Sequence, residues 1–195
     1  PEGSTKTTID GGIVVSHREV APPAVGVESD ASLSAESAGE TRIEMGKRFN
    51  TAQVVCFATA LPYELADWIV SDGRWRVVYF CGDIRKTHCA DEMKQFGDYL
   101  EQQLVPRFTP EGQDVDSVIE VLTVSATPRT RTELQDYHEA LRPKTTKHHR
   151  PTADGSYNAS TDYHKIFVDD ETYHQGHGQA YQRYGLRSDR GTLVV

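Results

Sequence analysis

Two stretches of the chain are apolar almost without interruption, at residues 75–81 and 118–124. Such runs are typical of strands covered on both faces of a sheet. Between them an apolar residue recurs every three or four positions, which predicts a helix with one buried face. The residues of this face are Cys89, Met93, Phe96, Leu100 and Leu104. We expect Thr87 to cap this helix, and Pro106 follows its end.

Shorter elements precede the first apolar run. Residues 52–58 have the composition of a strand, and residues 62–67 predict a short helix or turn. The Asp-Gly pair at 72–73 predicts a tight turn between a strand at residues 68–70 and the strand at 75–81. We therefore expect a hairpin at this point.

The C-terminal half repeats the alternation of helix and strand. Residues 130–141 predict a second helix, and residues 165–169 predict a third strand. The apolar residues of the second helix share one face, and they are Leu134, Tyr137 and Leu141. A polar loop at residues 142–157 separates these elements. A short helix near residues 179–184, ended by Gly185, leads to a last strand at the C-terminus, Thr192 to Val195.

This order of elements predicts an α/β fold. Helical crossovers between the apolar strands would place those strands parallel and cover both faces of the sheet. A thioredoxin-like sandwich, with a mixed central sheet and helices on both faces, fits the order. A ferredoxin-like domain and a small doubly wound sheet are the alternatives.

The N-terminal quarter differs from the rest in composition. Residues 1–50 contain one short apolar strand at residues 9–16 and a linker at 28–41 that is rich in Ser, Ala, Glu and Gly. We expect an extended arm at residues 1–50 and one domain at 51–195. The chain starts without Met and ends within a strand, which predicts a truncated piece of a longer protein, with a processed mature protein as the alternative.

Composition and charge narrow the class of protein. A chain of 195 residues is long enough to bury a core without disulfides or metals. The net charge of -8 argues against a nucleic-acid partner, which requires a basic face. No apolar run approaches the roughly 20 residues that cross a bilayer, and no signal peptide opens the chain. We expect a protein of the cytoplasm that has no membrane partner, and the three cysteines agree with a reducing compartment.

Cys81 is the candidate redox thiol. In a thioredoxin-like fold, the reactive cysteine follows the first central strand, and Cys81 stands at that place. Ile84 occupies the position of the resolving cysteine, and Cys89 lies too far into the predicted helix to replace it. Without a second thiol, dithiol–disulfide exchange cannot be completed. Cys81 is therefore interpreted as a buried structural residue, and a single-cysteine redox or peroxidatic thiol is the alternative.

A cluster of acids and histidines follows the third predicted strand. Its candidate acid/base residues are Asp169, Asp170, Tyr173, His174 and His177. The two histidines are three residues apart and could bind a metal with a third carboxylate. Hydrogen bonds to the backbone and helix capping explain the same residues, so no metal site is predicted. The basic run at residues 144–150 is interpreted as a solvated loop, with contact to a phosphate or an acidic partner as the alternative.

Nucleotide and acyl-transfer motifs are missing from the chain. No Gly-x-Gly-x-x-Gly follows a strand, and neither a phosphate loop nor a Gly-x-Ser-x-Gly elbow is present. The residues alone therefore indicate an α/β domain without a recognisable cofactor site or active site.

Four segments in a fixed order carry a family resemblance. They are Gly-Lys-Arg-Phe at 46–49, Ser-Asp-Gly-Arg-Trp-Arg-Val at 71–77, Phe-Val-Asp-Asp-Glu-Thr-Tyr-His-Gln-Gly-His-Gly at 167–178 and Arg-Gly-Thr-Leu-Val-Val at 190–195. With these segments the chain resembles the C-terminal domain of the phenol hydroxylase family of FAD-dependent aromatic monooxygenases, over roughly residues 9–195. That family includes phenol 2-monooxygenase and 3-hydroxybenzoate 4-hydroxylase.

The resemblance implies a thioredoxin-like fold without the redox cysteines and a role in forming a homodimer. It implies that FAD, NADPH and a phenol act in other domains of the same enzyme, so this chain alone would not catalyse the ring hydroxylation. Two alternatives stay open. One is a stand-alone relative that binds or converts a phenolic or polyketide-like molecule at the acid and histidine cluster. The other is a single-cysteine redox protein that uses Cys81.

Overall fold

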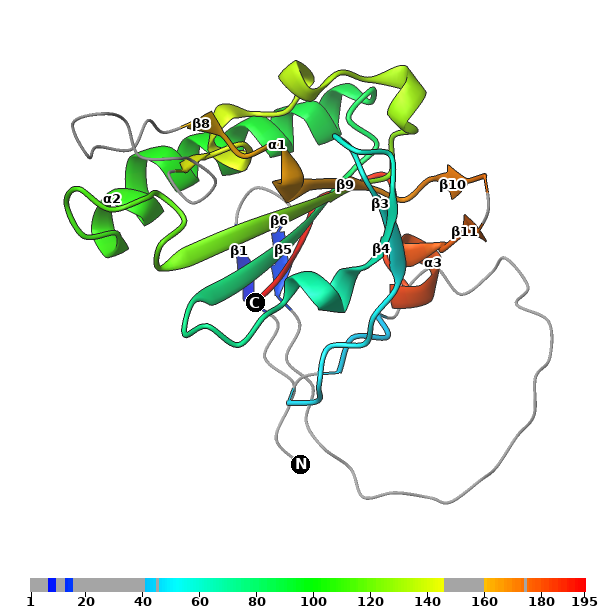
Figure 1. Cartoon of the computed structure of the whole chain (residues 1–195), viewed down its shortest axis with the longest axis horizontal. Coiled ribbons are helices and arrows are strands. Elements are labelled where there is room, and N and C mark those ends of the chain that lie inside the picture. Colours follow the sequence, from blue (N-terminus) through cyan, green and yellow to red (C-terminus); the bar gives the residue numbers. More distant parts are fainter. Residues whose placement is uncertain (1–6, 10–12, 16–40, 45, 146–159, 174) are drawn as a thin grey trace, which may run out of the picture.

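The structure is a computed structural model that describes residues 7–9, 13–15, 41–44, 46–145, 160–173 and 175–195. Its centre is a six-stranded mixed sheet with the order β12-β5-β6-β9-β3-β4 (Figure 1). The strands are β3 (Gln53–Cys56), β4 (Pro62–Glu64), β5 (Trp75–Gly82), β6 (Ile119–Ser125), β9 (Ile166–Val168) and β12 (Thr192–Val194). Strands β5, β6 and β9 are parallel, as predicted, whereas β12 and β3 run antiparallel to their neighbours.

Three small antiparallel ladders surround the sheet. They pair β1 (Thr7–Ile9) with β2 (Ile13–Val15), β7 (Lys144–Thr145) with β8 (Ser160–Thr161) and β10 (Glu171–Thr172) with β11 (Gly176–His177). The single strand predicted at residues 9–16 is therefore a hairpin. Most of the predicted linker at 28–41 and of the basic run at 144–150 lies outside the described residues.

The long predicted helix is present and extends past its expected end. It comprises α1 (Thr87–Tyr99), a π-helical turn (Leu100–Leu104) and α2 (Val105–Phe108). In the π turn the N–H of Val105 donates to the carbonyl of Leu100. Pro106 has no N–H to donate, and this wider turn lets the helix continue through it. Among the described residues, no helix combines the length and apolar composition needed to span a membrane.

The prediction that Thr87 caps this helix was wrong by one residue. Lys86 occupies the N-cap position with an extended backbone, and its side chain makes no capping hydrogen bond. Thr87 is instead the first helical residue. The helix is held by its buried face, which includes Met93 and Phe96, more than by its cap.

The second predicted helix does not form. Residues 129–131, 134–136 and 139–141 make three separate 3₁₀ turns. Side chains within the segment satisfy its backbone locally: the N–H of Glu133 donates to Asp136 at 2.7 Å, and the N–H of Ala140 donates to Nδ1 of His138 at 3.1 Å. Such local bonds compete with a continuous helix, although Tyr137 and Leu141 are buried as predicted.

The hairpin predicted at residues 68–70 was also wrong. The partner strand is β4, which pairs with β3, and a 3₁₀ helix (Leu65–Trp68) follows it. The Asp-Gly turn does lie before β5, with Gly73 at a positive φ of 83°. It leads β5 into parallel pairing with β6 instead of a hairpin, because the N–H of Trp75 donates to the carbonyl of Val118 at 2.9 Å.

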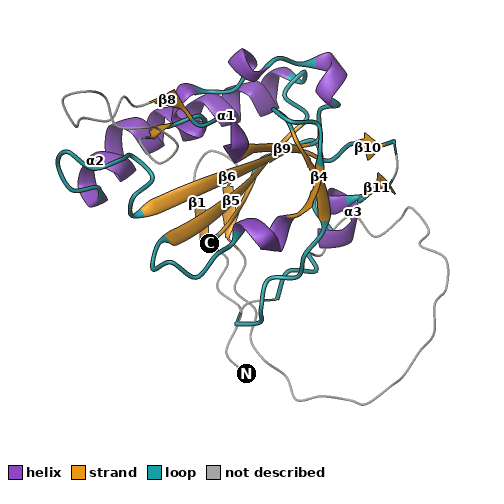
Figure 2. Cartoon of the chain, in the orientation of Figure 1, coloured by secondary structure: helices purple, strands orange, loops and turns teal. Residues whose placement is uncertain are grey.

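Each face of the sheet carries its own buried cluster, with α1 and the 3₁₀ turns over one face and α3 (Ala180–Tyr184) over the other (Figure 2). The α1 side includes Val77, Tyr79, Cys81, Met93, Phe96 and Tyr137. The α3 side includes Leu65, Val78, Phe80, Tyr181 and Tyr184, with Ile43 and Phe49 of the predicted arm packed against it. The alternation of β5 residues between these clusters follows from strand geometry. The architecture is the predicted thioredoxin-like α/β sandwich.

Candidate functional site

The acid and histidine cluster lies where β9 leads towards α3. Asp169 follows β9 directly, and its carboxylate accepts hydrogen bonds from the N–H groups of Ala180 and Tyr181, both at 2.9 Å. These are the first two residues of α3, so Asp169 satisfies donors that the helix itself cannot use. Nδ1 of His177 lies 3.4 Å from Asp169 and accepts the N–H of Gln179 at 2.8 Å.

The other members of the cluster do not converge on one point. Asp170 accepts the N–H of Arg129 at 2.9 Å and thereby fastens a 3₁₀ turn to the end of β9. The side chain of Tyr173 is 96% exposed, and His174 lies outside the described residues. The positions of Asp169, Asp170 and His177 thus support capping and loop attachment, which was one of the two explanations of the motif. Among the described residues no three His, Cys, Asp or Glu side chains are placed to hold a metal ion.

Tyr181 fastens α3 to the sheet close to Cys81. Its hydroxyl donates to the carbonyl of Val124 and accepts the N–H of Gly82, both at 2.8 Å. Gly82 has a positive φ of 72°, and a Cβ at this position would lie 3.0 Å from both Sγ of Cys89 and the carbonyl oxygen of Ser188. The chain after Cys81 is therefore closely covered.

Cys81 itself is completely buried. Burial raises the pKa of its thiol to about 12, so the thiol stays protonated at neutral pH. A protonated thiol is a poor nucleophile, and Cys81 has no exposed path to an oxidant or a partner thiol. This environment favours the structural interpretation of Cys81 over the redox alternative.

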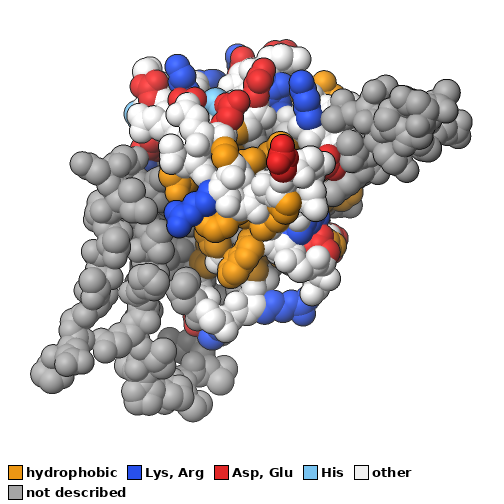
Figure 3. Space-filling model, turned by 90° about the vertical axis from the view of Figure 1, so that its left-hand side faces the viewer, with side chains coloured by type: hydrophobic (Ala, Val, Ile, Leu, Met, Phe, Trp, Pro, Cys, Tyr) orange, Lys and Arg blue, Asp and Glu red, His pale blue; other side chains and the backbone are white. Residues whose placement is uncertain are grey.

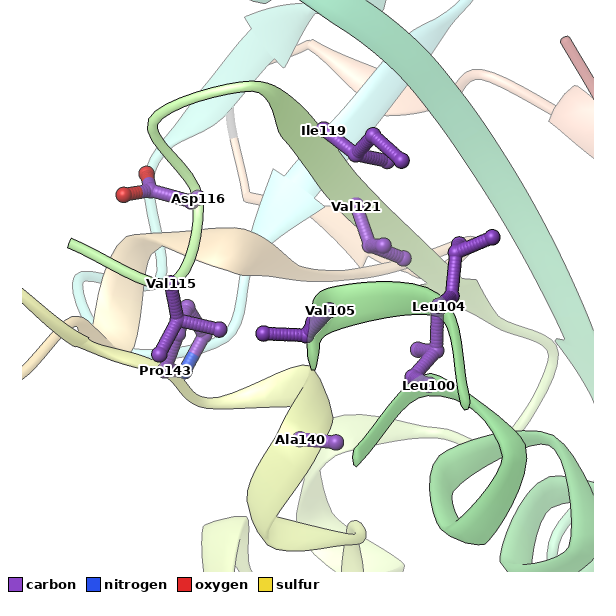
Figure 4. Close-up of a pocket in the computed structure, with 9 residues that line it drawn as sticks. All are labelled: Leu100, Leu104, Val105, Val115, Asp116, Ile119, Val121, Ala140 and Pro143. Atoms are coloured by element: carbon purple, nitrogen blue, oxygen red, sulfur yellow. The ribbon is translucent and has the colours of Figure 1, made fainter. Parts of the chain in front are cut away.

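A small apolar cavity lies between the π turn, α2 and the start of β6 (Figure 4). Its volume is about 20 Å³, and Leu104, Val105, Ile119 and Val121 are among the residues that line it. This space is about the size of one water molecule, whereas sites for small organic ligands measure several hundred Å³. The cavity therefore cannot admit a phenol without rearrangement.

A larger, open groove of about 530 Å³ lies between α1 and the 3₁₀ turns. Its charged lining residues are Asp91, Lys94, Glu101, Asp136, Glu139 and Arg142. Because acids outnumber bases here, the groove would repel the negatively charged pyrophosphate of a dinucleotide. Neither the groove nor the cavity is lined by Asp169, Asp170 or His177, so nothing in these two spaces supports a phenol site at the acid and histidine cluster.

Buried charges form a second cluster that the sequence analysis did not predict. Lys165 is 4% exposed and contacts Glu120, Asp116 at 3.3 Å and Asp162 at 3.7 Å. Arg74 contacts Asp116 at 3.2 Å and Glu120 at 3.0 Å. We call these five residues, with Asp72 and Arg76, the charge network. A signal for it was present, because Arg76 and Glu120 interrupt the two apolar runs and face each other in the β5–β6 register.

Sequence comparison relates this chain to known proteins. The family model for the phenol hydroxylase C-terminal dimerisation domain matches residues 13–195. An FAD-dependent monooxygenase of Aspergillus terreus is 36% identical over 157 residues, which cover 80% of this chain and 24% of the relative. A phenol 2-monooxygenase of Aspergillus fumigatus is 31% identical over 155 residues, 80% of this chain and 23% of the relative.

A third relative is more distant. The 3-hydroxybenzoate 4-monooxygenase of Comamonas testosteroni is 28% identical over 169 residues, which are 85% of this chain and 24% of the relative. The chain thus spans about a quarter of the length of the curated relatives it matches. Because the family model matches nearly the whole chain, from β2 to the C-terminal residue, this protein belongs to the family of phenol hydroxylase C-terminal dimerisation domains.

Proposed function

We propose that the chain joins two copies of an FAD-dependent monooxygenase that hydroxylates a phenolic ring. The observation that carries this proposal is the match of residues 13–195 to a dimerisation domain. The names of the relatives supply the reaction class, since they are FAD-dependent and phenol-type monooxygenases. In this proposal FAD, NADPH and the phenol bind to other domains of the same enzyme in the cytoplasm, and this chain contributes the contact between copies.

The two spaces described above do not suit FAD. The apolar cavity of about 20 Å³ is too small for an isoalloxazine ring, and the open groove presents more acids than bases to a pyrophosphate. The chain also lacks the glycine-rich fingerprint that brings a helix N-terminus to the phosphates. These features support an assembly role for the chain, with the flavin held elsewhere.

Sedimentation equilibrium of the purified chain tests the assembly role. We expect a concentration-dependent mass that approaches twice 21.8 kDa as the protein concentration rises. Weak dimers dissociate at micromolar concentrations. If the mass stays that of one chain even at about 100 μM, the proposal is contradicted.

Gel filtration in the presence of FAD tests the proposal that the flavin binds to other domains of the enzyme. We expect the flavin absorbance to separate completely from the protein peak. Co-elution of stoichiometric FAD with the chain would show that the cofactor site lies here, and the division of labour proposed above would be wrong.

A further inference from the structure

Large apolar side chains are exposed at one end of the sheet. Strands β5 and β6 begin at this end in parallel register, with Trp75 opposite Ile119, and the antiparallel β12 finishes there. We define the Trp75 surface as four exposed residues at this end, in β5, in α2 and in the loops that lead into β5 and β6. They are Val70, Trp75, Phe108 and Val115.

The side chains of this surface are well exposed for their type. Trp75 is 66% exposed, and Phe108 is 48% exposed. Val70 and Val115 lie in the loops that lead into β5 and β6, and Val115 and Val105 of α2 both line the cavity shown in Figure 4. Viewed towards this end of the molecule, hydrophobic side chains gather in the middle of the face, with charged side chains around them (Figure 3). Exposed apolar side chains that gather on one face and are rimmed by polar residues are typical of contact sites.

The backbone of Trp75 is fixed at the start of β5. Its backbone N–H donates to the carbonyl of Val118 at 2.9 Å. Its two neighbours in the chain, one before β5 and one in it, are bound to an acid: Arg74 and Arg76 contact the same carboxylate of Asp72 at 2.7 Å and 2.8 Å. Because side chains alternate along a strand, Trp75 points to the opposite face from these arginines. The charge network thus fixes the strand that presents the indole, so the backbone at this point need not become ordered on binding.

From these observations we propose that the Trp75 surface is the contact between two copies of this chain, with Trp75 as its anchor. The proposal rests on the assembly role above, since the dimerisation family supplies the identity of the partner. Tryptophan is enriched among the few residues that dominate binding energy. A two-fold axis through the surface would bring the same residues of both copies together.

The charges at this end agree with a second copy as the occupant. The chain carries a net charge of -8, so two copies repel each other where their acids are unpaired. Three acids beside the start of β5 and β6, Asp72, Asp116 and Glu120, are paired with Arg74 and Arg76. Burying the Trp75 surface therefore brings apolar side chains together while these three acids keep their counter-charges.

Sedimentation equilibrium of Trp75→Ala and a matched control tests this location. Leu61→Ala is the control, because Leu61 is 53% exposed in the turn between β3 and β4, at the other edge of the sheet. We expect Trp75→Ala to weaken the dimer about 30-fold, as for a hot-spot residue, and Leu61→Ala to change it less than about threefold. Both variants should melt like the wild type at concentrations where all three are monomeric, since both side chains are exposed.

Fluorescence provides a second reading that needs no loss of affinity. The chain has two tryptophans, so Trp68→Phe leaves Trp75 as the single tryptophan, which is excited selectively at wavelengths that tyrosine does not absorb. We expect the Trp75 emission to shift to the blue as concentration rises and the dimer forms, because the indole leaves water.

The outcomes separate the two proposals. A wild-type chain that stays monomeric overturns the assembly role and this surface with it. A wild-type dimer that is insensitive to Trp75→Ala, with Trp75 emission independent of concentration, leaves the assembly role standing and overturns the Trp75 surface. That second result would assign the surface to another partner, such as the flavin-binding domains.

Discussion

Replacing Lys165 by methionine tests how the charge network contributes to stability. The side chain of Lys165 is 6% exposed and lies against three carboxylates, those of Glu120, Asp116 and Asp162. Methionine has a similar length and keeps the packing, but it removes the only lysine charge of the network. Arg74 and Arg76 remain, and they neutralise only part of the negative charge of the buried acids.

The expected loss follows from the burial. Removing one partner of a buried ion pair costs about 3–5 kcal/mol, since a buried charge loses its counter-charge. For a chain of this size, 1 kcal/mol corresponds to about 2–4 °C in melting temperature, so we expect a decrease of about 6–20 °C. The matched control is Lys47→Met. Lys47 contacts Glu44 at 2.6 Å, but both side chains are well exposed, and such a pair contributes at most about 1 kcal/mol.

Urea denaturation followed by circular dichroism measures both variants against the wild type. Similar small losses for Lys165→Met and Lys47→Met would refute the reasoning, because burial would then make no difference. A double variant, Lys165→Met with Glu120→Gln, adds a direct measure of the pairing. We expect it to lose less stability than the sum of the two single variants, since the second change removes an acid that the first left uncompensated.

Three further predictions concern the site and the core. Asp169→Ala should destabilise the chain by about 1–2 kcal/mol in urea denaturation, because α3 loses its cap, and the exposed Glu171→Ala should not. Gly97→Ala should cost about 1–3 kcal/mol in the same assay, because its Cβ would lie 2.2 Å from Cγ of His138; an unchanged midpoint would mean that the ring moves aside freely. Burial raises the Cys81 pKa from 9.0 to about 12, so the folded state keeps a proton that the unfolded state releases; stability should be constant below about pH 8 and fall by about 1 kcal/mol between pH 8 and pH 10. A Cys81→Ala variant that loses as much over that interval would contradict this assignment.

The sequence predicted best the elements whose apolar residues form a continuous run or recur at helical spacing. The apolar runs at 75–81 and 118–124 became β5 and β6, and the spaced apolar residues between them became α1. Periodicity was misleading at residues 130–141. There the spacing of Leu134, Tyr137 and Leu141 is compatible with burial on a helix, but hydrogen bonds from local side chains divide the segment into 3₁₀ turns.

The candidate site was predicted in composition but not in arrangement. The acidic and histidine motif after β9 was found, and the capping role of Asp169 was one of the two explanations considered. The charge network was not found, because its members lie far apart in sequence, from Asp72 to Lys165. Only the parallel pairing of β5 with β6 and the return of β9 bring them into contact.

The sequence by itself determined the α/β alternation, the family and the absence of a nucleotide fingerprint, because each depends on local periodicity or on a short ordered motif. Tertiary structure alone decided which charged side chains are buried together and which apolar side chains stay exposed. Trp75 and Val77 share one face of β5, yet one is exposed and the other buried. The physical reason is that exposure depends on which distant elements cover a strand, and the spacing of residues within the strand does not encode that.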